Sequence, residues 1–101
     1  MSIQRQKFSK SSRIYSSKYL RVFQDKTQTN SLEVSVSKKF FRLAVERNRV
    51  KRRIKEIYRK NKISSSLVGR ITFAIFGPFG ELSYNLAEKE ILRVLDKNEV
   101  I

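Results

Sequence analysis

The segment from residue 37 to residue 62 constrains the fold most, because it combines a regular apolar stripe with dense positive charge. Twelve of the chain's 23 lysines and arginines fall in this segment, against only two glutamates. Its apolar side chains recur at the helical period of about 3.6 residues, and they are Leu43, Val50, Ile54, Ile57 and Tyr58. We therefore predict a long amphipathic helix, with its apolar stripe packed on a sheet and its charged face exposed.

Alternation of apolar and polar side chains predicts three strands, at residues 14–23, 32–37 and 71–76. The polar run at residues 25–31 is typical of a turn, so we expect the first two strands to pair as an antiparallel hairpin. The third strand is rich in apolar residues, and we expect it to be well buried.

The residues after the third strand predict a turn and then a second amphipathic helix. Two glycines and a proline at residues 77–80 favour the turn, and Ser83 is a candidate helix cap. The apolar stripe of this helix comprises Leu86, Ala87, Ile91, Val94 and Leu95.

The order strand, strand, helix, strand, helix predicts an α+β fold, a small α-β sandwich in which helices cover a sheet. At 101 residues the chain has the size of one domain with one modest core. We expect residues 14–98 to form that domain, residues 1–13 to be a basic arm or a short helix, and residues 99–101 to be a tail. Base rates favour a right-handed crossover if the strands flanking the basic helix are parallel.

The composition narrows the classes of function. The chain contains no cysteine and no histidine, which excludes disulfides, zinc sites, thiol nucleophiles and the usual general base near neutral pH. No apolar run approaches the roughly 18 to 20 residues that cross a bilayer, and the N-terminal residues lack the apolar core of a secretion signal. We predict a cytoplasmic protein without catalytic residues, metal ligands or membrane contact. Its net charge of +14 predicts a polyanionic partner.

Helical spacing aligns four side chains of the basic segment, Asn48, Arg52, Lys55 and Arg59, with Lys51 beside them. Arginine donates forked hydrogen bonds to phosphate oxygens, and lysine supplies point charge. A solvated helix face normally mixes charges of both signs, whereas this face is almost uniformly positive. We therefore favour nucleic-acid binding over a solvated surface.

Three basic residues near the start of the helix have two interpretations each. Arg47 borders the apolar stripe, so it either contacts RNA or braces the helix against the sheet. Lys38 and Lys39 end a strand just before the helix, where they either extend the phosphate-binding surface or form a simple turn.

Aromatic side chains of the first strand form a second candidate surface. Alternation places Tyr15, Tyr19 and Phe23 opposite its apolar face, beside Arg21. Such a row can stack on unpaired bases. The alternative is burial under an N-terminal arm that carries Phe8, which is the more common fate of aromatic side chains on a small sheet.

Two motifs at a fixed spacing carry a family resemblance. The sequence VSVSKK at residues 34–39 is followed, after seven residues, by RNRVKR at residues 47–52 and then by Lys55. This arrangement closely resembles the signature of the bacterial ribonuclease P protein component. The resemblance spans roughly residues 15–98, and outside the central segment it is a likeness of architecture.

The resemblance implies an RNA-binding subunit that joins a catalytic RNA and assists endonucleolytic removal of the 5′ leader from precursor tRNA. The RNA would hold the active site and would need magnesium, so we expect no protein-held cofactor and no obligate protein partner. The resemblance also implies a left-handed crossover, which we follow over the right-handed default. Few residues precede the first predicted strand, so we expect a reduced version of the family's leader-binding cleft.

The resemblance and the charge pattern together give two sets of candidate site residues. Those expected to contact the catalytic RNA are Lys38, Lys39, Arg42, Arg47, Asn48, Arg49, Lys51, Arg52, Lys55 and Arg59. Those expected to contact the leader are Phe8, Tyr15, Tyr19 and Phe23. The leading alternative is a small ribosomal or structural RNA-binding protein without a role in cleavage. A DNA-binding regulator and a protein-only nuclease are weaker alternatives, because the sequence shows neither a helix-turn-helix pair nor clustered carboxylates.

Overall fold

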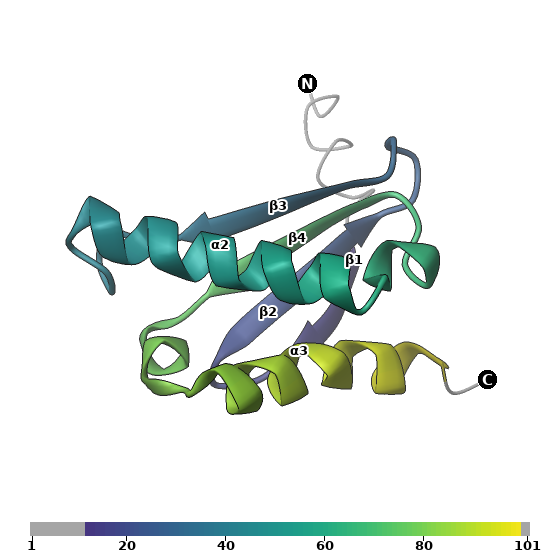
Figure 1. Ribbon diagram of the computed structural model, residues 1–101. Helices are drawn as coiled ribbons and strands as arrows, with labels where there is room; N and C mark the ends of the chain where they lie inside the picture. The colour runs from purple at the N-terminus through teal and green to yellow at the C-terminus, as the bar shows by residue number, and fades with distance from the viewer. Residues whose placement is uncertain (1–11, 100–101) are drawn as a thin grey trace, which may run out of the picture.

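The computed structural model describes residues 12–99, in which two α-helices cover one face of a four-stranded sheet (Figure 1). The strands are β1 (Ser12–Ser16), β2 (Leu20–Asp25), β3 (Ser31–Val36) and β4 (Arg70–Ile75). They lie in the order β1-β2-β4-β3, with β3 parallel to β4 and the other neighbours antiparallel. The predicted α+β fold is confirmed, and its sheet is mixed.

The helical elements are α2 (Ala44–Lys60), the short 3₁₀ helices η2 (Ile63–Ser65) and η3 (Gly77–Glu81), and α3 (Tyr84–Glu99). Ser83 caps α3 as predicted, because its hydroxyl oxygen accepts a hydrogen bond from the Leu86 amide at 3.3 Å. Within the described residues, β1 begins two residues inside the predicted arm and α3 ends at the first residue of the predicted tail. Within residues 12–99, no helix has both the length and the apolar character needed to cross a membrane.

The crossover from β3 through α2 to β4 is left-handed. In Figure 1, β3 and β4 both run from right to left with β3 above β4, and α2 returns from left to right in front of the sheet. This hand is opposite to that of nearly all βαβ units. The resemblance therefore predicted the crossover correctly, and the default from base rates is wrong for this chain.

The predicted first strand is in fact two strands joined by a tight turn. The turn is closed by a hydrogen bond from the Ser17 amide to the Leu20 carbonyl at 2.9 Å, and the Ser17 hydroxyl oxygen accepts one from the Tyr19 amide at 3.1 Å. Serine side chains stabilise turns through such local bonds. The prediction of one strand is wrong because the polar residues of this turn also fit the alternation of a strand.

The predicted hairpin between the first two strands is also wrong, because β4 lies between β2 and β3. Val34 of β3 is opposite Phe73 of β4, and Phe73 is opposite Val22 of β2. Alternation determines which side chains share a face of the sheet, but it carries no information about which strands are neighbours.

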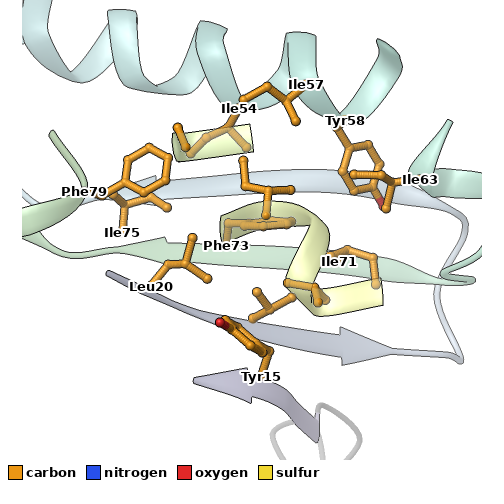
Figure 2. Packing of buried hydrophobic residues seen from close by; sticks show 14 of the residues in the cluster. Tyr15, Leu20, Ile54, Ile57, Tyr58, Ile63, Ile71, Phe73, Ile75 and Phe79 are labelled. Atoms are coloured by element: carbon orange, nitrogen blue, oxygen red, sulfur yellow. The ribbon is translucent and has the colours of Figure 1, made fainter. Parts of the chain in front are cut away.

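The core lies between the sheet and the two helices, and Figure 2 shows how its side chains meet. Ile54 and Ile57 of α2 are fully buried together with Phe73 of β4, and the ring of Tyr58 meets Phe73 edge to face at 6.1 Å. Full burial of such an apolar side chain contributes about 1.5–3 kcal/mol. As predicted, β4 is well buried, through Ile71, Phe73 and Ile75.

Two residues of the predicted apolar stripes are exposed instead. Leu43 is 59% exposed because it precedes the first turn of α2. Leu86 is 51% exposed, since the residues of α3 that reach the core are Ala87, Ile91 and Val94. These three share one row of the helix, and Leu86 lies about 100° away from that row.

Candidate nucleic-acid interface

The basic face of α2 is the line formed by Asn48, Arg52, Lys55 and Arg59, and all four side chains are exposed as predicted. The opposite side of the helix is buried through Val50, Ile54, Ile57 and Tyr58. Packing of this apolar stripe therefore determines which side of α2 faces solvent.

Long side chains on the basic face border an open groove of about 580 Å³. Its lining residues are Asn48, Lys51, Arg52, Lys55, Glu56 and Arg59. Glu56 is the single acid among them, so the groove carries a strong positive potential. At an α-helical rise of 1.5 Å per residue, the lining residues span about 17 Å along the helix. A groove of this length and charge suits several consecutive phosphates.

Basic residues on the side of α2 that faces α3 contact α3 and the segment that precedes it. A guanidinium nitrogen of Arg53 donates to the Leu82 carbonyl at 3.1 Å. Lys60 Nζ lies 3.4 Å from Glu88 Oε2, and the Asn61 amide nitrogen donates to the same oxygen at 3.0 Å. The hydrogen bond from Asn61, aided by the charge of Lys60, lowers the pKa of the Glu88 carboxyl. Arg53 and Lys60 therefore make side-chain contacts within the protein, unlike the residues of the basic face.

The lead-in segment, residues 37–43, connects β3 to α2 and carries three exposed cations, Lys38, Lys39 and Arg42. A turn forms its first half, because the Ser37 carbonyl accepts hydrogen bonds from the amides of residues 40 and 41 at 3.2 and 3.0 Å. The predicted turn at Lys38 and Lys39 is therefore present. It leaves both ammonium groups exposed just before α2 begins.

Arg47 bonds the lead-in segment, not the sheet. Its Nη1 donates to the Phe41 carbonyl at 2.9 Å and to the Arg42 carbonyl at 3.0 Å. Arg47 thus has a structural role, as one of its two interpretations predicted. It braces α2 against the lead-in segment, whereas we expected it to brace the helix against the sheet. Its side chain is partly covered, whereas the neighbouring Asn48 and Arg49 are exposed.

Tyr15 does not belong to an outward aromatic row, and that prediction is wrong. The side chain is only 8% exposed and lies in the core (Figure 2). Its hydroxyl donates a hydrogen bond to Glu90 Oε2 at 2.9 Å. A bulge between Arg13 and Tyr15 shifts the register, so that Tyr15 pairs with Val22 on the helix-covered face. Burial, with a smaller contribution from the bond to Glu90, raises the pKa of the Tyr15 hydroxyl.

The other three candidates for leader contact lie elsewhere. Phe23 is partly buried and lies on the far face of the sheet, which we define as the face opposite α2 and α3. Tyr19 lies in the turn between β1 and β2, where it is partly buried and Lys18 Nζ sits 5.2 Å from its ring centre. Phe8 lies outside the described residues.

The structure adds an aromatic and cationic cluster that the sequence reasoning missed, formed by Arg21, Phe40 and Phe76. The Arg21 guanidinium carbon lies 5.3 Å from the centre of the Phe76 ring, and Phe40 meets Phe76 edge to face at 6.3 Å. Phe40 is 48% exposed. Alternation in β4 already placed Phe76 opposite the core, so this signal was present; the contact with Phe40 depends on the tertiary fold.

Comparison with known proteins identifies the family. The family model described as Ribonuclease P matches residues 4–99 of the chain. The chain belongs to the ribonuclease P protein family. It is also 64% identical over 33 residues to the ribonuclease P protein component of Porphyromonas gingivalis. That match covers 33% of this chain and spans about a quarter, 24%, of the relative's length.

Solved structures of ribonuclease P proteins share the fold. The protein from Staphylococcus aureus matches with a TM-score of 0.75 and 25% identity, over 99% of this chain and 93% of that one. The protein from Thermotoga maritima matches with a TM-score of 0.73 and 22% identity, over 89% of this chain and 86% of that one. The second likeness, at this low identity, concerns the fold alone.

Residues 40–46 separate the two halves of the ribonuclease P motif, and they form the second part of the lead-in segment and the first residues of α2. The half at residues 34–39 forms the end of β3 and the first turn after it, and the half at residues 47–52 forms the beginning of α2. Within residues 12–99, no group of three or more acidic side chains could hold a metal ion. The surface that the motif builds is cationic and offers hydrogen-bond donors.

Proposed function

We propose that this chain is the protein subunit of a bacterial ribonuclease P. It binds the catalytic RNA and the 5′ leader of precursor tRNA, and so assists endonucleolytic removal of the leader. The observation that carries this proposal is the exposed basic face of α2, which shares Asn48 and Arg52 with the second half of the family motif. Family membership supports the assignment.

The proposed contribution of α2 is electrostatic. Lysine and arginine side chains along the groove neutralise RNA phosphates and release condensed counterions, which drives binding. Asn48 both donates and accepts hydrogen bonds, so it adds directional contacts between the cations. The candidate set at Lys38, Lys39 and Arg42 extends this surface toward the end of β3.

We assign the leader to the far face of the sheet, where Phe23 and the cluster of Arg21, Phe40 and Phe76 offer ring faces beside a positive charge. Tyr19, in the turn between β1 and β2, is a further candidate for this contact. Unpaired bases stack on such side chains. Contact with the leader favours precursor over mature tRNA, because only the precursor carries one. Tyr15 is withdrawn from this set, since it is buried under α3.

The chemistry of cleavage belongs to the RNA in this proposal. The protein supplies no catalytic residue, and magnesium is held by the RNA. The holoenzyme works in the cytoplasm, and the subunit needs no second protein.

A competition experiment tests the choice of partner. The protein is bound to labelled ribonuclease P RNA at fixed salt, and unlabelled competitors of equal length are added: ribonuclease P RNA, ribosomal RNA fragments and duplex DNA. We expect ribosomal RNA and DNA to compete at least about tenfold more weakly than ribonuclease P RNA. Equal competition by ribosomal RNA would favour a ribosomal or structural RNA-binding role.

A further inference from the structure

We propose that Arg47 is a positioning residue: it fixes the backbone of the lead-in segment so that Lys38, Lys39 and Arg42 continue the basic face of α2 onto the RNA. This inference rests on the proposed function, because one of its tests measures binding to ribonuclease P RNA. It gives Arg47 a task different from that of its exposed neighbours in the motif.

The geometry of the contact favours this role. One nitrogen, Arg47 Nη1, donates to two consecutive carbonyls, those of Phe41 and Arg42, at 2.9 and 3.0 Å. Both carbonyls lie just before α2, where the chain changes from a turn into a helix. A charged donor strengthens each bond relative to a neutral one. Arg47 therefore clamps the backbone at the point that sets the direction of the lead-in segment.

The start of α2 lacks the side chain that normally fixes a helix N-terminus. Serine, threonine, aspartate or asparagine usually occupies the N-cap position and accepts a backbone hydrogen bond. Leu43 occupies it here and has no polar side-chain atom. The Glu46 carboxylate accepts a bond from the Leu43 amide, but at a long 3.4 Å. The clamp from Arg47 compensates for this weak cap.

The charge of Arg47 supports the same conclusion. Arg47 lies near the N-terminus of α2, where the helix dipole disfavours a cation. The two carbonyl oxygens supply the partial negative charge that makes this position favourable. An arginine that served the helix alone would be better placed in the last turn, where Arg59 and Lys60 lie.

Two further anchors hold the lead-in segment; Lys38 and Lys39 lie between them, and Arg42 directly follows the second. The Phe41 ring is 8% exposed and packs so closely on Gly80 that a Cβ there would lie 2.7 Å from the ring. The Ser37 carbonyl holds the turn at the other end. With Arg47 in place, the segment has little freedom, so its exposed cations keep a fixed position relative to α2.

A double-mutant cycle separates positioning from direct contact. Arg47→Met keeps a long side chain and removes the donors, and it is combined with Lys39→Ala/Arg42→Ala, which removes two of the positioned cations. We expect Arg47→Met to weaken binding to ribonuclease P RNA about tenfold alone, but less than about twofold in the Lys39→Ala/Arg42→Ala background. Arg49→Ala is the matched control: it should weaken binding by the same factor in both backgrounds. Equal losses for Arg47→Met in both backgrounds would overturn the proposal, because they would mean that Arg47 contacts RNA itself.

Hydrogen exchange on the free protein tests the clamp without RNA. The amides of Phe40 and Phe41 should exchange faster in Arg47→Met than in wild type, and Arg47→Lys, which keeps a donor, should restore part of the protection. Melting curves confirm that each variant is folded. Unchanged exchange in a folded Arg47→Met variant would overturn the clamp. If wild type binds no ribonuclease P RNA while the exchange result holds, the proposed function fails and the clamp stands.

Discussion

At the scale of single residues, the hydroxyls of Tyr58 and Tyr15 make the stability of this protein depend on pH. Burial raises the pKa of Tyr58 to about 12, and it also raises the pKa of Tyr15, whose hydroxyl bonds Glu90. A neutral phenol is compatible with the apolar surroundings of Tyr58, and a phenolate is not. The folded state therefore retains protons that the unfolded chain releases.

This difference predicts alkaline destabilisation. Unfolded tyrosine ionises near pH 10.0, whereas folded Tyr58 keeps its proton to about pH 12, so the free energy of unfolding falls as pH rises through that window. We expect this residue to account for up to about 2 kcal/mol of the fall, since one pKa unit is worth about 1.4 kcal/mol. Urea unfolding of wild type and Tyr58→Phe between pH 9 and pH 11.5 measures it. Parallel curves for the two proteins would refute this assignment.

Gly69 predicts a second effect at this scale. Its φ is +83°, and a Cβ would lie 2.3 Å from the Asp25 carbonyl oxygen. Gly69→Ala should therefore lower stability by roughly 2–4 kcal/mol, through the cost of the left-handed backbone and the displaced strand end. Gly77→Ala is the control, because its Cβ would meet the Phe40 ring at 3.4 Å without a positive φ. Thermal unfolding that gives equal losses for both variants would contradict this explanation.

At the scale of elements, α2 determines how RNA affinity responds to salt. If the proposed interface makes about 6–10 phosphate contacts, affinity should fall on the order of 10³–10⁵ between 50 and 200 mM salt. Arg52→Ala should lower the slope of log affinity against log salt by about one. Lys26→Ala removes an exposed cation between β2 and β3, outside the basic face, and should leave the slope unchanged. Equal slopes for Arg52→Ala and wild type would remove Arg52 from the interface.

The elements also differ in how far the sequence could predict them. The helix α2 and its exposed line were predictable, because an apolar stripe at the helical period fixes both the helix and its orientation. The division between β1 and β2 was not, since Ser17 and Lys18 fit a strand as well as a turn. The position of β4 between β2 and β3 depends on contacts between distant segments, which local patterns do not encode.

In the candidate site, too, local sequence patterns predicted some features and missed others. Exposure of Arg52, Lys55 and Arg59 followed from their positions on the helix. The burial of Tyr15 depends on a bulge in β1, and the contact between Phe40 and Phe76 depends on how two loops meet. The hydrogen bonds of Arg47 to the lead-in segment were also beyond local patterns, because they require the geometry of the turn.

At the scale of the whole molecule, a net charge of +14 on 101 residues predicts that anions stabilise the fold. Sulfate should raise the melting temperature above that in chloride at equal ionic strength, by about 4–8 °C for each kcal/mol of binding free energy. Sulfate also stabilises proteins in general, because it is excluded from their surface. The variant Arg52→Gln/Lys55→Gln/Arg59→Gln separates this general stabilisation from sulfate binding at the basic face. In this variant, sulfate should still raise the melting temperature through the general stabilisation, but the additional rise from binding at the basic face should be lost. An identical sulfate effect in both proteins would place the anion site elsewhere.

The most direct test of the proposed function is cleavage of precursor tRNA at low magnesium by a bacterial ribonuclease P RNA, with and without this protein. We predict that wild type restores cleavage at the 5′ end of the mature tRNA, and that Arg49→Ala/Arg52→Ala, confirmed as folded, does not. Restoration by the double variant would remove the basic face of α2 from the mechanism. Failure of wild type with every bacterial ribonuclease P RNA tried would contradict the proposed function itself.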